Sequence, residues 1–190
     1  ALLDEIATKK DIALRHAVAQ ILMRAGELDE AVRHYREMVR IAPSRTDIFT
    51  ELGDLLLRRK VPGEAEQHYR AALKQDTNFP PALVGLGSIH LLHGELAPAA
   101  MRFERAISRD GEYAPAYMQL GIARMQQGQL DVAAEQFKRL VDLHPDSPVG
   151  HIRLATALVP LGKMKAAKTH FEHALSLQPD AIEAANGLAW

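Results

Sequence analysis

The sequence repeats every 34 residues, and this period limits the fold more than any other feature. Pro145 and Pro179 are 34 residues apart, and Pro43 lies 102 residues, or three periods, before Pro145. Repeats on this period align without an insertion, and they begin at Ile12, Thr46, Pro80, Ala114 and Pro148, with a sixth opening at Ile182. A unit of this length cannot bury its apolar face alone, so neighbouring units must stack.

Small and apolar residues occupy fixed columns of the repeat. Column 7 holds Val18, Leu52, Leu86, Leu120, Leu154 and Leu188, and column 8 holds Ala19, Gly53, Gly87, Gly121, Ala155 and Ala189. Column 20 holds Ala31, Ala65, Ala99, Ala133 and Ala167, and column 24 holds Tyr35, Tyr69, Phe103, Phe137 and Phe171. Columns 4, 7, 8 and 11 form the apolar stripe of a first helix, and columns 20, 24 and 27 form the facing stripe of a second. We expect helices near residues 12–25 and 29–42, repeated every 34 residues.

Helix ends are marked by glycine, proline and capping residues. Column 15 contains Gly26, Gly94, Gly128 and Gly162, but Lys60 in the second repeat, and it predicts a left-handed residue after each first helix. Ser147 before Pro148 is a predicted N-cap, and Asp180 with Glu183 has the spacing of a capping box. Pro160 falls inside the predicted first helix of the fifth repeat, so that helix should kink or stop near Val159.

Composition narrows the class of protein. Hydrophobic residues make up 47% of the chain and aromatic residues only 5%, and no apolar/polar alternation is present, which favours helices. The net charge of -1 shows no basic surplus, so we expect no nucleic-acid partner. The absence of cysteine excludes disulfides and thiolate metal sites, and it fits cytoplasm and periplasm equally well. No apolar run approaches the length of a membrane span, so direct membrane insertion is not expected.

The column pattern resembles the tetratricopeptide repeat family, whose motif is W-x2-L-G-x2-Y, then A-x3-F, then P. The resemblance covers residues 12–190, although no repeat has Trp at column 4 and Thr77 and Gly111 replace the proline. It implies an all-α, right-handed solenoid of helix-turn-helix repeats. The segments are a lead-in at 1–11, repeats at 12–45, 46–79, 80–113, 114–147 and 148–181, and the start of a truncated sixth repeat at 182–190.

The C-terminal end is expected to be incompletely covered. Trp190 falls nine positions into the sixth repeat, in the middle of a predicted helix. The face formed by Phe171, Ala174 and Leu175 is then covered only by Ala185, Leu188 and Ala189. Solenoids need polar capping helices. The sequence therefore predicts a fragment of a longer array, or self-association through this end.

Neither catalytic residues nor cofactor or metal ligands stand out. His90 and His93 are three residues apart, as are His170 and His173, but the repeat register separates the first pair and places His170 on the polar side of a second helix. Structural metal sites need about four ligands. No nucleophile with a base and no glycine-rich phosphate loop is present, so an enzyme is not expected in this chain.

Two ligand sites known in the family are missing. One subgroup binds acidic C-terminal tails of chaperones through a clamp of Lys, Asn and Arg side chains. Here the matching positions include Glu51, which would repel a carboxylate, and Gly85, which offers no donor. The asparagine ladder of the O-linked N-acetylglucosaminyltransferases is also absent, because column 6 contains Ala17, Glu51, Gly85, Gln119 and Arg153.

The resemblance implies that columns 5, 9 and 12 of the first helices line a concave groove that binds peptides. The candidate groove residues are His16, Gln20, Thr50, Asp54, Val84, Ser88, Met118, Ile122, Met125, Ile152 and Thr156. This surface is polar in the first two repeats and apolar from the third onward. We expect Val84, Met118 and Ile152 to align in a row with Ile122 and Met125, although ordinary helix packing could account for about half of the apolar positions.

The sequence thus predicts a non-enzymatic scaffold or adaptor that binds a peptide or an amphipathic helix of another protein. Two alternatives stay open at this point: an accessory domain of a larger enzyme of the glycosyltransferase or sulfotransferase type, and a self-assembly module.

Overall fold

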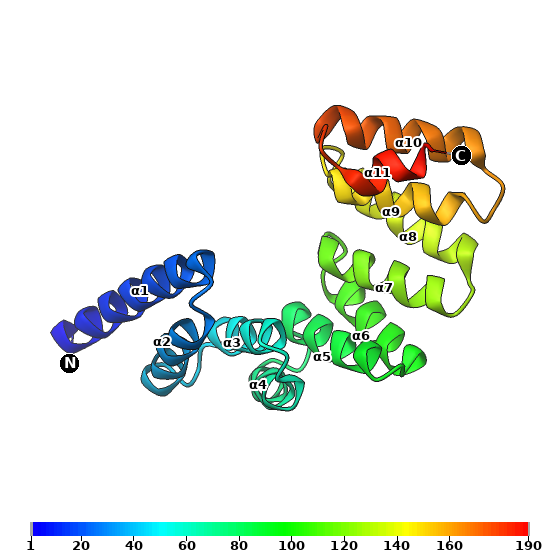
Figure 1. Cartoon of the computed structure of the whole chain (residues 1–190). Helices are drawn as coiled ribbons and strands as arrows, with labels where there is room; N and C mark the ends of the chain where they lie inside the picture. Colours follow the sequence, from blue (N-terminus) through cyan, green and yellow to red (C-terminus); the bar gives the residue numbers. More distant parts are fainter. Residues whose placement is uncertain (1, 190) are drawn as a thin grey trace. The chain divides into compact units, whose positions relative to one another are not determined.

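The computed structural model describes the backbone of residues 2–189 and the side chains of residues 11–189. Over this range the chain is all-α, without strands. The helices are α1 (Leu2–Ala25), α2 (Leu28–Ile41), α3 (Thr46–Arg58), α4 (Pro62–Gln75), α5 (Pro80–Leu92), α6 (Leu96–Arg109), α7 (Ala114–Gln126), α8 (Leu130–Leu143), α9 (Pro148–Leu158), α10 (Met164–Leu177) and α11 (Ile182–Gly187) (Figure 1). The expected all-α array of tandem helical hairpins is confirmed.

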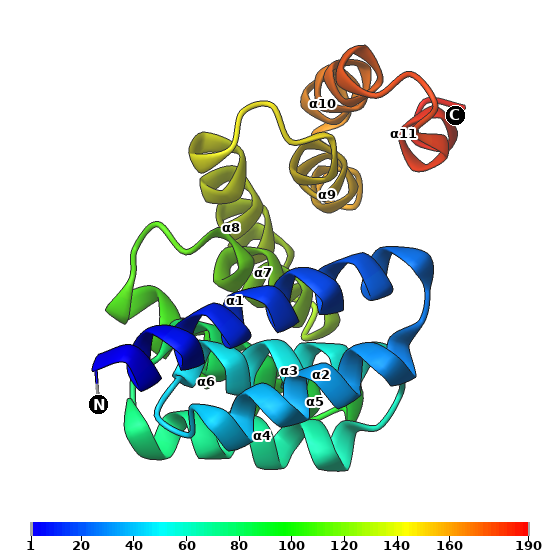
Figure 2. The same cartoon turned by 90° about the vertical axis from the view of Figure 1, so that its left-hand side faces the viewer.

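The chain divides into two compact units, residues 1–89 and residues 90–190, and the boundary falls within α5. In the first unit α1 pairs with α2 and α3 with α4, while α2 also packs on α3. In the second unit α7 pairs with α8 and α9 with α10, and α8 also packs on α9 (Figures 1 and 2). From α1 to α4, and again from α6 to α11, each helix therefore packs on the next one along the chain, as a repeat array requires.

The first helix is longer than expected. It begins at Leu2 rather than near residue 12, so the lead-in is helical. The reason is local: residues 2–11 contain neither proline nor glycine, so no helix-breaking residue separates them from the repeat. The other helices begin and end close to the predicted positions.

The predicted left-handed residues follow the first helices of the five repeats. Gly26, Gly94, Gly128 and Gly162 have positive φ angles of 84°, 75°, 75° and 69°. Lys60 takes the same conformation, with a φ of 61°, although this conformation is unfavourable for any residue with a Cβ atom. The geometry of the hairpin turn therefore persists in the second repeat without its glycine.

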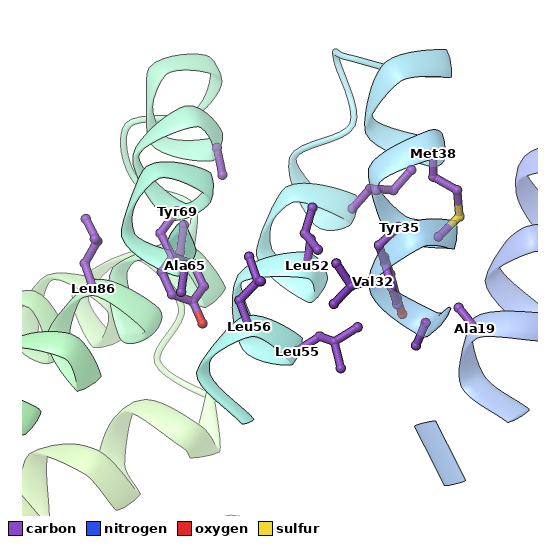
Figure 3. Packing of buried hydrophobic residues seen from close by; sticks show 14 of the residues in the cluster. Ala19, Val32, Tyr35, Met38, Leu52, Leu55, Leu56, Ala65, Tyr69 and Leu86 are labelled. Atoms are coloured by element: carbon purple, nitrogen blue, oxygen red, sulfur yellow. The ribbon is translucent and has the colours of Figure 1, made fainter. Parts of the chain in front are cut away.

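The core of the first unit is built from the repeat columns. Tyr35 and Tyr69 are almost completely buried, and the column-20 residues Ala31 and Ala65 are fully buried beside them. Figure 3 shows both tyrosine rings between helices, with Leu52 and Leu56 of α3 in the space that separates them. Small residues in columns 8 and 20 bring the helices close enough for the aromatic rings to fill the remaining volume.

The core of the second unit follows the same plan, with Phe137 and Phe171 buried against the column-20 residues Ala133 and Ala167. The Ser147 side chain accepts a hydrogen bond of 3.2 Å from the backbone N–H of Gly150, so the predicted N-cap of α9 is confirmed. The helix ends at Leu158, two residues before Pro160, as expected from a residue that cannot continue the hydrogen-bond ladder.

The last helix differs in detail from the prediction. Its N-cap is Ala181, without a side-chain cap, so the predicted capping box at Asp180 is wrong. The helix stops at Gly187, and it is Ala184 that becomes fully buried, whereas Ala185 and Ala189 are exposed. The predicted mid-helix position of Trp190 lies outside the described residues. A helix of this length turns one narrow stripe toward α10, and Ala184 lies on that stripe.

Candidate functional site

The candidate surface is the outward stripe of the first helices, columns 5 and 9 of each repeat together with Met125; we call it the first-helix face. In the first unit it comprises His16, Gln20, Thr50, Asp54, Val84 and Ser88, and in the second unit it comprises Met118, Ile122, Met125, Ile152 and Thr156. Because the helices of a unit are stacked, residues of one column come from neighbouring helices within that unit.

A network of polar side chains covers this face at α1 and α3. The His16 imidazole donates through Nε2 to the Glu51 carboxylate at 2.8 Å, and Gln20 donates to the Tyr35 hydroxyl at 3.4 Å. Burial, followed by the nearby Glu51 carboxylate, raises the pKa of Tyr35. Glu51 is therefore a member of the site, although the sequence marked it only as an obstacle to acidic ligands.

A second tyrosine–carboxylate pair lies one repeat further along. The Tyr69 hydroxyl donates to Asp54 Oδ1 at 2.6 Å. Burial among the surrounding helices raises the pKa of Asp54, and the Glu51 carboxylate adds to this effect, while the Tyr69 hydrogen bond opposes it. The Asp54 side chain still contacts solvent. Glu51 and Asp54 together make this part of the face acidic.

The hydroxyl groups of the face are engaged by their own helices. Thr50 Oγ1 donates to the Asp47 carbonyl at 2.8 Å, Ser88 Oγ to the Val84 carbonyl at 2.9 Å, and Thr156 Oγ1 to the Ile152 carbonyl at 2.8 Å. Thr50 is only 3% exposed, so its predicted place on an accessible surface is wrong. A hydroxyl that donates a hydrogen bond to a carbonyl of the preceding turn is satisfied within its own helix and needs no partner from outside.

The apolar part of the face divides into surface and core. Met118, Ile122 and Met125 lie on one side of α7, half-buried, and pack against the core of the second unit. Ile152 on α9 is only 5% exposed and belongs to that core, so its predicted role as a surface residue is wrong. Val84 is half-buried on α5 in the first unit. The accessible apolar strip thus consists of Met118, Ile122 and Met125 on one helix.

A cavity of about 260 Å³ lies beside the polar network in the first unit. Its lining combines apolar side chains, Ile12, Met38 and Ile48, with the charged pair Arg45 and Asp47 and with His16 and Glu51. Arg45 donates to Asp47 at 2.8 Å, which lowers the pKa of Asp47. Each charged group at the cavity edge thus has a partner: Arg45 pairs with Asp47, and Glu51 accepts from His16.

The structure also brings His151 beside His170 and His173, which the sequence analysis considered only as a pair. His151 is buried, and its Nδ1 lies 2.9 Å from His170 Nδ1, while its Nε2–H donates to the Pro145 carbonyl at 2.8 Å. The His173 ring meets the His151 ring edge-on, with centroids 4.4 Å apart. The signal was present in the spacing, because columns 4 and 23 also meet in the second repeat, where the rings of Phe49 and His68 have centroids 6.0 Å apart.

Two of these histidines, His151 and His170, share a hydrogen bond, and the ring of His173 packs edge-on against His151. Since a carbonyl only accepts, His151 Nε2 carries a proton, and neutral His151 accepts at Nδ1 from His170. Burial and the neighbouring imidazoles lower the pKa of His170. Among the side chains of residues 11–189, no group of three or more His, Asp or Glu is arranged to hold a metal ion. Likewise, no helix within residues 2–189 combines the length and apolar composition needed to cross a membrane.

The geometry defines a class of protein: tandem helical hairpins that expose a stripe of first-helix side chains, an architecture of interaction scaffolds. Tetratricopeptide repeat models match residues 12–55, 50–107, 84–148 and 124–190. The chain belongs to the tetratricopeptide repeat (TPR) family. Proteins of this scaffold class are generally not enzymes, and they mediate protein interactions.

Several solved structures share the fold. MamA from Desulfovibrio magneticus RS-1 is 24% identical, with a TM-score of 0.69 over 90% of this chain and 97% of its own. YrrB, a TPR protein with an unusual peptide-binding site, is 19% identical, with a TM-score of 0.64 over 98% of this chain and 96% of its own. TTC0263, a thermophilic TPR protein of Thermus thermophilus, is 18% identical, with a TM-score of 0.82 over 94% of this chain and 100% of its own. No curated protein sequence matches the chain.

Proposed function

We propose that this chain is a protein-interaction adaptor that binds a peptide or an amphipathic helix on its first-helix face. The observation that carries the proposal is the strip of Met118, Ile122 and Met125, three apolar side chains that stay partly exposed along one side of α7. Contact of such a strip with water is unfavourable, and methionine adapts to irregular partners.

The chemistry of the face differs between the two units, and this sets the character of the ligand. The second unit offers an apolar strip, which suits the leucine, isoleucine or phenylalanine side chains of an amphipathic segment. The first unit offers Glu51 and Asp54, which favour lysine or arginine in a segment bound there. The structure of YrrB supports the proposal, since that TPR protein has a peptide-binding site.

A displayed peptide library would test the proposal even while the natural partner is unidentified. Peptides selected on the wild-type chain are measured against Ile122→Glu and against Met101→Glu, a control in the same unit whose side chain is already 69% exposed on α6. We expect apolar or amphipathic peptides whose affinity falls at least tenfold with Ile122→Glu and is unchanged with Met101→Glu. Circular dichroism should show the same helix content in all three proteins.

Two results would count against the proposal. If Ile122→Glu unfolds the second unit, Ile122 is a core residue and the strip is ordinary packing. If that variant folds and binds the selected peptides as tightly as the wild type, recognition takes place on another surface.

A further inference from the structure

The cavity of about 260 Å³ in the first unit, which we call the α1–α3 cavity, adjoins the first-helix face at His16. Its apolar wall comes from three helices, with Ile12 of α1, Met38 of α2 and Ile48 of α3. Ala13 also belongs to the lining and is exposed, so the cavity is open to solvent on the side of α1. An apolar void of about 150 Å³ accepts a benzene molecule, so this cavity has room for one long side chain of a bound segment.

The charges around the α1–α3 cavity do not cancel. Arg45 donates to both carboxylate oxygens of Asp47, so these two groups form a closed pair. Glu51 accepts from the His16 imidazole, which is counted as neutral at pH 7, and this hydrogen bond leaves the carboxylate charged. The lining therefore carries one positive and two negative groups, a net charge of -1.

A second carboxylate lies about one turn further along α3. Asp54 accepts a hydrogen bond of 2.6 Å from the Tyr69 hydroxyl, which is a neutral donor. Among the side chains of residues 11–189, neither Glu51 nor Asp54 forms an ion pair with lysine or arginine. The Glu51 side chain is 37% exposed, and covering its charge with a purely apolar ligand would be costly. A ligand that covers this place therefore has to bring a positive charge.

A lysine or arginine side chain meets both requirements. Its methylene stem packs along apolar surface while its charged end stays with polar groups. In the α1–α3 cavity the stem would contact Ile12 and Ile48, and the charged end would donate to Glu51 at the polar edge. Acidic side chains are repelled, whereas leucine or methionine would fill the apolar part and leave Glu51 without a counter-charge.

We propose that the α1–α3 cavity binds one lysine or arginine side chain of the partner peptide, with its stem against Ile12 and Ile48 and its charged end on Glu51. This anchor rests on the proposed function, since it belongs to a peptide held on the first-helix face. The cavity lies wholly within the first unit, so recognition of the anchor does not require the apolar strip of the second unit. Glu51, which would repel acidic chain ends, is then the residue that selects a basic one.

Two substitutions test the charge and the volume of the cavity separately. Glu51→Gln removes the charge and keeps an oxygen that accepts from His16, while Glu27→Gln removes an equal charge at an exposed position before α2, outside the cavity. Ala13→Leu narrows the cavity from an exposed position of α1, and Ala17→Leu is the matched control, exposed on α1 but outside the lining. Circular dichroism and thermal melting verify that each variant folds.

Peptides selected from the displayed library on the wild-type chain supply the probe. Each is synthesised with its basic residue and with norleucine in its place, which keeps an apolar stem without the charge. By isothermal titration calorimetry we expect norleucine to weaken binding about tenfold in the wild type and in Glu27→Gln, and to make no difference in Glu51→Gln. Ala13→Leu should weaken binding of the basic peptide to a similar extent, whereas Ala17→Leu should leave it unchanged.

Several results would overturn the basic anchor, and the first of them leaves the proposed function intact. Selected peptides that lose affinity with Ile122→Glu but share no lysine or arginine position bind the face without this anchor. Norleucine peptides that bind the wild type as tightly as the basic peptides show that no charge is recognised. A preference for the basic residue that persists in Glu51→Gln assigns recognition to another group. A library that yields no binding peptide removes both the anchor and the proposed function.

Discussion

Replacing Gly85 by alanine adds one methyl group where α5 approaches the Tyr69 ring most closely. A Cβ atom at this position would lie 2.3 Å from Tyr69 Cε1 and 2.4 Å from Cζ. The ring cannot simply move away, because a Cβ atom at Gly53 on α3 would also lie only 2.6 Å from Cε1. The Tyr69 side chain is fully buried between these helices, and Figure 3 shows it near Leu86 of α5.

Two effects of opposite sign decide the outcome. Alanine is favoured over glycine inside a helix by about 1 kcal/mol. Forcing an extra methyl group into a well-packed core costs about 1–3 kcal/mol, and the short distance at Gly85 places this substitution toward the upper end. We therefore expect Gly85→Ala to lower the free energy of unfolding by about 1–2 kcal/mol, although the same substitution in an open helix position would raise it.

Gly63 in α4 supplies that open position, because no atom lies within 4 Å of a Cβ atom built there. Urea titrations followed by far-UV circular dichroism should show Gly63→Ala unchanged or slightly more stable than the wild type and Gly85→Ala less stable. In a Tyr69→Leu background the penalty of Gly85→Ala should shrink. If Gly85→Ala stabilises the chain as much as Gly63→Ala does, the ring has room to move and the close-approach argument is wrong.

Phe103→Ala should lower the free energy of unfolding by about 3–5 kcal/mol, measured in the same titration, because the ring is fully buried. Lys60→Gly should raise the free energy of unfolding by about 1 kcal/mol, and with it the melting temperature, because Lys60 has a φ of 61° that glycine adopts without strain. An unchanged melting temperature would contradict this. Burial lowers the pKa values of His68 and His170 from the usual 6.5, so the unfolded chain binds more protons at acid pH. The contribution of these two histidines to the free energy of unfolding should be full above pH 6.5 and should be lost as the pH falls below it. The melting temperature of a His170→Gln variant should therefore fall less steeply with decreasing pH, and a pH dependence identical to that of the wild type would exclude His170 as a contributor.

The sequence predicted the fold because each column of the repeat has a mechanical role that does not depend on its neighbours. A glycine in column 15 takes a positive φ wherever it occurs, and even Lys60 is held in that conformation by the turn. An aromatic residue in column 24 is buried in all five repeats. Pro160 ends α9 for a reason internal to that helix. The 34-residue period and the backbone preferences of glycine and proline were sufficient to predict these features from the sequence.

The candidate face was harder to predict, because exposure in one column varies with the surroundings of each repeat. Met118 and Ile152 are both apolar residues of column 5, yet Met118 is half-exposed and Ile152 is buried. Thr50 of the same column is buried too, since its hydroxyl bonds to the Asp47 carbonyl and needs no solvent. The helical period is the same in each repeat and does not report these differences.

The contact between columns 4 and 23 shows how the repeat fixes geometry and leaves chemistry free. The same pair of positions holds Phe49 and His68 in the second repeat, and His151 and His170 in the fifth, with ring centroids 6.0 and 5.2 Å apart. In the second repeat the contact is a packed aromatic pair. In the fifth repeat, the Pro145 carbonyl accepts a hydrogen bond from His151 Nε2–H. Neutral His151 therefore has no proton on Nδ1, and this atom accepts from His170 Nδ1–H. It is this third group, the Pro145 carbonyl outside the paired columns, that turns a packing contact between two rings into a directional hydrogen bond.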